Sequence, residues 1–182
     1  MHRVAVLELL RDHLARVRDV REAEMGAEIV RFVEAHEDCF LRACLPGHLT
    51  GSAWIVDAAR TQTLLTHHRK LDRWLQLGGH ADGETDLAQV AMREAREESG
   101  LSRLRLVSGA LFDVDRHSIP ERGDVPGHWH LDLRFMIEAD PSEPCVVSDE
   151  SHALAWVPLS EVARFNESES LARLVRKTLR YC

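Results

Sequence analysis

The stretch that decides the fold runs from residue 78 to residue 101 and reads GGHADGETDLAQVAMREAREESGL. Its second half predicts a helix over residues 87–99, because no proline interrupts the run and Thr85 or Asp86 can cap the first turn. Gly100 follows at the position where a left-handed residue often ends a helix. The glycine pair at the start therefore predicts a loop that leads into a helix rich in carboxylates.

The acids of this helix do not lie where a solvent-exposed helix would carry them. At about 100° per residue, Glu94 and Glu98 fall at the edge of the apolar stripe, and all three glutamates, Glu97 included, lie within about 100° of arc. Carboxylates so placed repel one another and lose hydration unless cations meet them. Arg93 precedes Glu97 by four residues and can neutralise one charge. The remaining charge favours a divalent cation, and oxygen ligands suit Mg²⁺, with Mn²⁺ as the alternative.

The spacing of these residues resembles the signature of the Nudix hydrolase family, G-x5-E-x7-R-E-U-x-E-E-x-G-U, in which U is aliphatic. The matching positions are Gly79, Glu84, Arg93, Glu94, Glu97, Glu98, Gly100 and Leu101. Four residues instead of five lie between Gly79 and Glu84, and eight instead of seven lie between Glu84 and Arg93. Ala95 occupies the first aliphatic position. The two shifts cancel, so they put only the role of Glu84 in doubt. Residues 78–83 and 128–132 also resemble a subgroup of the family whose substrate is not settled.

The resemblance implies an α/β/α sandwich with a mixed β-sheet, an architecture that the order of expected strands and helices also favours. It further implies Mg²⁺-dependent hydrolysis of a diphosphate bond, in a nucleoside diphosphate linked to another moiety, by a metal-activated water. The implied metal ligands are Glu94, Glu97, Glu98 and the backbone carbonyl of Gly79, and the implied catalytic residues are Arg93, Glu94, Glu97 and Glu150. For Glu150, an exposed loop acid without a role is the alternative.

A second polar pattern lies on the strand expected at residues 128–137. Alternation places His128, His130, Asp132 and Arg134 on one face of this strand. Residues 104–115 are also expected to form a strand, and its end continues into a similar alternating row of acids and a histidine. A solvated sheet face is one interpretation, and a metal or proton-transfer site is the other. The residues expected to bind substrate are His68, Lys70, Arg73, His80, His128, His130, Asp132 and Arg134.

The rest of the chain divides at Pro46-Gly47. Residues 1–45 are expected to form an N-terminal helical hairpin packed on the core, with a break near Asp19 or Gly26, and residues 46–182 are expected to form the Nudix-like domain. Scaffolding, formation of a homodimer and shaping of substrate choice are the alternatives for the hairpin. Strands are expected at 49–56, 63–68 and 153–157, and a closing helix at 171–179.

Composition limits the classes of function. The chain has 182 residues, a net charge of −7 and no basic tract, which argues against nucleic acid as a partner. Its four cysteines show no C-x-x-C spacing, so free thiols and a cytoplasmic location are expected. Neither a signal peptide nor a membrane span is expected, since acids and arginines interrupt the first amphipathic segment. The expected partner is a small diphosphate substrate.

Two other functions remain open at this point. A Nudix-fold sensor would bind a nucleotide without cleaving it, although the complete set of acids favours catalysis. An isopentenyl-diphosphate isomerase would also use histidines and acids at its metal site, but that family's N-S-x-C-x-H-P motif has no counterpart in this sequence.

Overall fold

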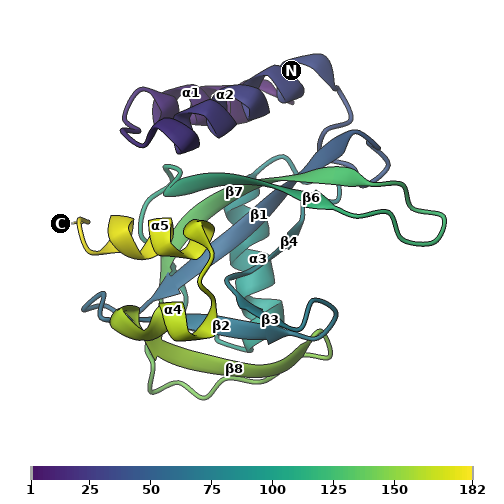
Figure 1. Ribbon diagram of the computed structural model, residues 1–182. Helices are drawn as coiled ribbons and strands as arrows, with labels where there is room; N and C mark the ends of the chain where they lie inside the picture. The colour runs from purple at the N-terminus through teal and green to yellow at the C-terminus, as the bar shows by residue number, and fades with distance from the viewer. Residues whose placement is uncertain (1, 182) are drawn as a thin grey trace. The chain divides into compact units, whose positions relative to one another are not determined.

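The structure is a computed structural model that describes residues 2–181 (Figure 1). The elements follow in this order: α1 (Val4–Leu14), α2 (Val20–Ala35), β1 (Gly47–Val56), β2 (Gln62–His68), β3 (Arg73–Leu75), β4 (Leu77–His80), α3 (Leu87–Ser99), β5 (Arg105–Leu106), β6 (Asp113–Ile119), β7 (His128–Glu138), β8 (Ser151–Pro158), η1 (Leu159–Glu161), α4 (Val162–Phe165) and α5 (Glu169–Thr178). The strand order is β3-β2-β1-β7-β5, with β4 paired to β1, β6 to β7 and β8 to β2.

Two compact units make up the described chain. The first contains the described residues through Ser52 together with Gly78–Ala91 and Ser108–Phe135, and the second contains Ala53–Leu77, Met92–Val107 and the described residues from Met136 onward. Strands β1 and β7 and helix α3 contribute residues to both units, and each unit is described by itself below.

The N-terminal helices belong to the first unit, where they form the expected hairpin (Figure 1). The break falls at Asp19, whose side chain accepts a hydrogen bond from the Glu22 backbone and caps α2. Gly26 lies inside α2, and a Cβ there would come within 2.8 Å of the Leu14 side chain, so this glycine permits the close approach of the two helices. A buried contact of 2.8 Å between His13 and Glu22 also joins them.

The sheet of the first unit is organised by β7. Strand β6 pairs with it antiparallel, and residues 113–119 lie opposite residues 134–128. The expected strand over residues 104–115 is wrong in its middle: only β5 at Arg105–Leu106 and the start of β6 are extended. The reason is a local turn, because the Ser108 hydroxyl accepts a hydrogen bond from the backbone of Ala110 and Gly109 lies between them.

Strand β1 contacts a helix in each of the two units. In the first unit, a Cβ on Gly51 would meet the backbone of Leu87 at 2.8 Å, which places the start of α3 directly against the strand. In the second unit, the indole of Trp54 donates a 2.7 Å hydrogen bond to Thr178 of α5. The α/β/α arrangement expected from the sequence is therefore confirmed.

Helix α3 has the bounds that the sequence predicts. The Asp86 side chain accepts hydrogen bonds from two backbone amides of the first turn. Glu84 accepts hydrogen bonds from the backbone of Thr85 and Asp86, so it orders the turn that precedes the helix. Gly100 ends the helix at φ +69°, and a Cβ there would lie 2.7 Å from Val146. The sequence of the caps therefore fixes both ends of this helix.

The second unit collects the remaining strands around β2, which pairs antiparallel with β1, β3 and β8. Its pairing with β8 is irregular between His67 and His68. The cysteines Cys39, Cys44 and Cys145 are free, whereas Cys182 lies outside the described residues. Among residues 2–181, no helix is both long and apolar enough to cross a membrane.

Candidate functional site

The acids of α3 in the second unit differ sharply in exposure. Glu98 is buried at 7% exposure, the Glu94 side chain is 14% exposed and the Glu97 side chain is 60% exposed. This gradient agrees with the helical wheel, which places Glu94 and Glu98 at the edge of the apolar stripe. Arg93 lies 2.7 Å from Glu94 and 3.2 Å from Glu97, so a single guanidinium contacts two of these carboxylates.

An acid from a distant part of the sequence joins this group. Burial raises the pKa of Glu94 and the Arg93 charge lowers it, while the charges of Glu97 and Glu150 raise it further. Glu150 is exposed and precedes β8, so the structure brings it within electrostatic range of Glu94 although 55 positions separate them in the chain. The second unit thus gathers acids from α3 and from the entrance to β8.

The segment that carries Glu150 is held by Arg69. The backbone amide of Arg69 donates to the Glu150 carbonyl at 2.8 Å, and its guanidinium donates to the carbonyls of Asp149 and Ser151 at 3.0 and 2.8 Å. Burial lowers the pKa of the neighbouring His68, and the Glu150 charge partly opposes that shift. The Glu150 charge therefore acts on His68 at the end of β2 as well as on Glu94 of α3.

The expected substrate-binding residues of the second unit lie on the hairpin formed by β2 and β3. His68 is partly buried and pairs in register with Arg73. Lys70 and Arg73 are exposed, so both cations are accessible to an anion.

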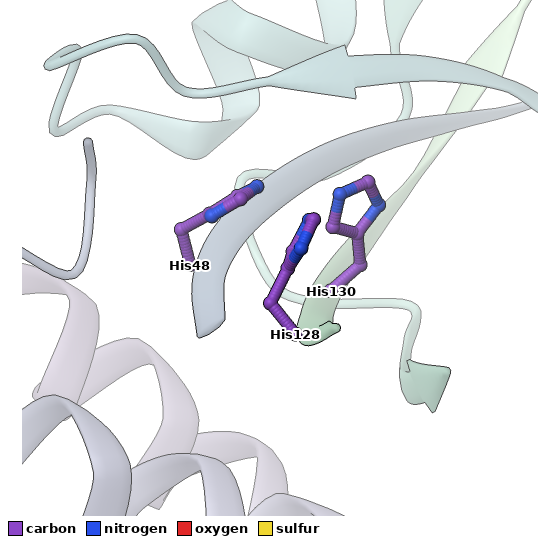
Figure 2. Close-up of side chains that lie close together, drawn as sticks. All are labelled: His48, His128 and His130. Carbon is purple, nitrogen blue, oxygen red and sulfur yellow. The ribbon is translucent and has the colours of Figure 1, made fainter. Parts of the chain in front are cut away.

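The histidines of the first unit form a cluster at the beginning of β1 and β7 (Figure 2). Figure 2 shows His48 on β1 and His128 and His130 on β7 gathered together, and their ligand nitrogens lie within 4.8 Å of one another. The His80 ring lies 5.0 Å from that of His48 and 4.8 Å from that of His130. We call these four residues the histidine cluster. His117 of β6 lies at its border, 5.3 Å from His130.

Strand direction explains why residues so far apart in sequence meet. The backbone amide of Trp129 donates to Pro46, and that of Ala139 donates to Val56, so β1 and β7 run parallel. Their first residues consequently lie side by side. Strand β4 pairs with β1 on its other edge and brings His80 to the same place.

Burial disfavours the charged form of three rings of the histidine cluster, those of His48, His80 and His130. Burial lowers the pKa of His130 to about 2, with a smaller effect from His117, and burial and the Arg42 charge lower that of His80 to about 4. Burial also lowers the pKa of His48. One contact of 3.2 Å links Nε2 of His80 to Nε2 of His130, so a proton on one ring can be donated to the other.

The polar row of β7 consists of His128, His130, Asp132 and Arg134. Its last two residues, Asp132 and Arg134, are fully buried. Arg134 is 2% exposed and contacts Asp132 at 2.8 Å, Asp115 at 2.8 Å and Asp113 at 3.2 Å. Asp132 is 1% exposed and accepts hydrogen bonds from the hydroxyls of Thr50 and Ser52. The interpretation of this row as a solvated sheet face is therefore wrong for these two residues. Their expected contact with substrate stays a prediction, and their observed partners are buried protein groups.

The glycine pair of the opening stretch lies on β4 in the first unit. A Cβ on Gly78 would be 2.3 Å from the Ser52 hydroxyl and 2.7 Å from its Cα, so only glycine fits there. Gly79 is partly buried beside it, and the role of its carbonyl as a metal ligand stays a prediction. Sequence reasoning did not assign His48 to a site. The sequence feature that could have drawn attention to His48 is its position directly after Pro46-Gly47, at the start of an apolar strand.

Known proteins support the same fold. A family model described as the NUDIX domain matches residues 48–178. A probable DHNTP pyrophosphohydrolase from Lactococcus lactis subsp. cremoris is 24% identical over 136 residues, which are 72% of this chain and 81% of that protein.

Two solved structures show how far the likeness extends. A Nudix-family hydrolase from Clostridium perfringens is 27% identical with a TM-score of 0.54, covering 73% of this chain and 97% of its own. The dihydroneopterin triphosphate pyrophosphohydrolase of E. coli is 17% identical with a TM-score of 0.56, and the match covers 73% of this chain and 96% of that protein. Because the family model spans most of the described residues and includes α3 with its acids, this chain belongs to the Nudix pyrophosphohydrolase family.

Proposed function

We propose that this protein hydrolyses a diphosphate bond in a nucleoside diphosphate linked to another moiety, and that the reaction depends on Mg²⁺. The observation that carries the proposal is the group of acids on α3 in the second unit, where Arg93 contacts both Glu94 and Glu97 and Glu98 is buried on the same helix. Family membership supports the reaction class, and the acids support the need for a divalent cation.

The donor set fits a hard cation. Carboxylate oxygens are the ligands that Mg²⁺ and Mn²⁺ prefer. Glu98 is buried and the Glu94 side chain is 14% exposed, and the single positive charge of Arg93 contacts the carboxylates of both Glu94 and Glu97. We assign the three glutamates as ligands, with the carbonyl of Gly79 as a further one. Bound Mg²⁺ supplies charge neutralisation between the anionic substrate and this acidic site and polarises the scissile phosphate.

The side chains themselves supply positioning and proton transfer. Arg93 holds the carboxylates of Glu94 and Glu97 in place through its two ion pairs. Glu150 is exposed, and its carboxylate can accept the proton of the attacking water, as could Glu94 or Glu97. Attack at phosphorus then releases a nucleoside monophosphate and a phosphorylated second product.

Exposed cations on the hairpin of β2 and β3 suit the part of the substrate farthest from the cleaved bond. Lys70 and Arg73 can contact a distal phosphate, and His68 can donate a hydrogen bond to it. For His80, His128 and His130 of the first unit, contact with substrate stays a prediction from the sequence. For Asp132 and Arg134 we propose support of the β6–β7 pairing, because their partners are buried.

The experiment is a substrate panel in Mg²⁺ with identification of the products. It contains nucleoside triphosphates, dinucleotides, nucleotide sugars and dihydroneopterin triphosphate, the last because two similar proteins are named for it. We expect Glu97→Gln and Glu98→Gln each to lower kcat/KM by about 100-fold or more, as loss of transition-state charge stabilisation does. Glu161→Gln is the control, since Glu161 is a partly exposed acid outside the group that pairs with Arg164.

Two results would overturn the proposal. Full activity of both α3 variants would exclude the glutamates, and tight nucleotide binding in calorimetry without any product from the panel would favour a sensor. Formation of a homodimer and a location in the cytoplasm stay predictions from the sequence, to be measured by light scattering and by fractionation of cells.

A further inference from the structure

His48 is a buried imidazole whose ring nitrogens make no hydrogen bond of good geometry. It is 3% exposed, and within the described residues the Cys44 backbone is close enough to raise its pKa but makes no hydrogen bond of good geometry with either ring nitrogen. A neutral imidazole carries one donor and one acceptor. Each buried polar group left unsatisfied is unfavourable for folding, so native structures rarely contain one without a ligand, water or functional reason.

The surroundings of His48 consist of other imidazoles. The rings of His80, His128 and His130 lie 4.9–5.0 Å from its own, measured between centroids. Nitrogens of His48, His128 and His130 approach within 4.8 Å of one another. Figure 2 shows these three side chains converging from β1 and β7.

We propose that His48, His128 and His130 bind one divalent transition-metal ion of the Zn²⁺ type, with His80 as a fourth ligand. This site is separate in composition from the glutamates of α3 and does not depend on the proposed hydrolysis. Neutral imidazole is a preferred ligand of Zn²⁺, Cu²⁺ and Ni²⁺, whereas Mg²⁺ prefers oxygen. A metal ion would give His48 the partner that the protein does not supply.

The distances require only a small contraction. Two nitrogens bound to one Zn²⁺ at 2.0–2.1 Å in tetrahedral geometry are about 3.3 Å apart. The nitrogens of the three histidines lie within 4.8 Å, so closure needs a movement of roughly 1–2 Å, which rotation of imidazole side chains provides. His128 and His130 are only partly buried, so an ion can enter from solvent beside β7.

A hydrogen-bonded histidine network is the competing explanation. The contact between Nε2 of His80 and Nε2 of His130 at 3.2 Å does satisfy one donor and one acceptor in this way. Within the described chain it gives neither nitrogen of His48 a hydrogen bond of good geometry, so the network accounts for only part of the cluster. A metal ion shared by the three residues accounts for all of it.

The test is a Zn²⁺ titration of the full chain, stripped with a chelator, in excess Mg²⁺ and in competition with a chromogenic zinc indicator. We expect one equivalent to bind, and we expect His48→Gln and His128→Gln each to weaken binding by about 100-fold or more, at least as much as loss of an outer-shell contact does. His36→Gln is the matched control, because His36 belongs to the same unit and instead contacts Phe32.

Two further readouts separate this site from the acids and from misfolding. Co²⁺ in place of Zn²⁺ should give the visible absorption of a tetrahedral ion, and Glu97→Gln should leave Zn²⁺ affinity unchanged. Because His128 is partly exposed, its variant tests the site even where His48→Gln does not fold. Absence of stoichiometric binding, equal affinity in the His128 variant, or loss of binding in Glu97→Gln would each overturn the proposal.

Discussion

Replacement of Arg134 by methionine tests whether the polar row of β7 serves folding or substrate binding. The Arg134 side chain is 3% exposed and contacts three aspartates at 2.8–3.2 Å. Burial alone would lower its pKa, but the charges of Asp132, Asp115 and Asp113 raise the pKa above its usual range, so the guanidinium stays charged. Methionine fills a similar volume and removes only the charge and the hydrogen bonds.

The expected loss in the free energy of unfolding comes from the three aspartates that Arg134→Met leaves without their cation. Removal of one partner from a buried ion pair lowers the free energy of unfolding by about 3–5 kcal/mol, because the other charge is left uncompensated. Proton uptake limits this loss: an aspartate with the reference pKa of about 3.9 takes up a proton at pH 7 at a cost of about 4 kcal/mol, and at pH 5 at about 1.5 kcal/mol. We therefore expect Arg134→Met to lose about 3–5 kcal/mol at pH 7 and about 2–3 kcal/mol less at pH 5.

Urea unfolding followed by tryptophan fluorescence measures this loss as a lower midpoint at unchanged slope. Asp115→Asn is the control, because Asp115 is the most exposed of the three acids and its amide keeps an acceptor for Arg134. Its loss should be clearly smaller than that of Arg134→Met. A variant Arg134→Met within about 1 kcal/mol of the parent, with a raised KM for a cleaved diphosphate, would refute the reasoning and return this residue to the substrate site.

Three other outcomes follow from single contacts. Gly78→Ala should lower the free energy of unfolding by about 1–3 kcal/mol in urea, because its Cβ would lie 2.3 Å from a serine hydroxyl, whereas Gly109→Ala, with nothing within 4 Å, should not. Burial raises the pKa of Cys39 to about 11 and of Cys44 to about 12. The unfolded chain releases these protons first, so the free energy of unfolding should fall as pH rises from about 9 to 11 and should fall less in Cys44→Ala. Thr178→Val removes the acceptor of a buried indole and should lower the free energy of unfolding by about 1–3 kcal/mol in a thermal melt, while Thr178→Ser retains it.

Local signals in the sequence were sufficient for α3. The cap at Asp86 and the stop at Gly100 depend on neighbours a few residues away, and both act as expected. The exposure of Glu94 and Glu98 also followed from helical periodicity alone. The approach of Glu150 to Glu94 could be expected only from the family resemblance, because it depends on how β2 and β8 pair. At Ser108 and Gly109 the strand prediction was wrong, because a short turn interrupts a stretch whose residues alternate as in a strand.

The polar row of β7 shows where alternation stops being informative. The alternation of side chains along a strand correctly placed His128, His130, Asp132 and Arg134 on one face. Strand β6 places Asp113 and Asp115 opposite Arg134 and Asp132. Alternation gives the face of a side chain but not its depth, which depends on what covers that part of the strand. The first two residues remain partly exposed beside β1, whereas Asp132 and Arg134 are covered and must find partners within the protein. One row therefore contains two kinds of chemistry: at its partly exposed end, imidazoles that can still accept a ligand, and at its buried end, charges already paired with one another.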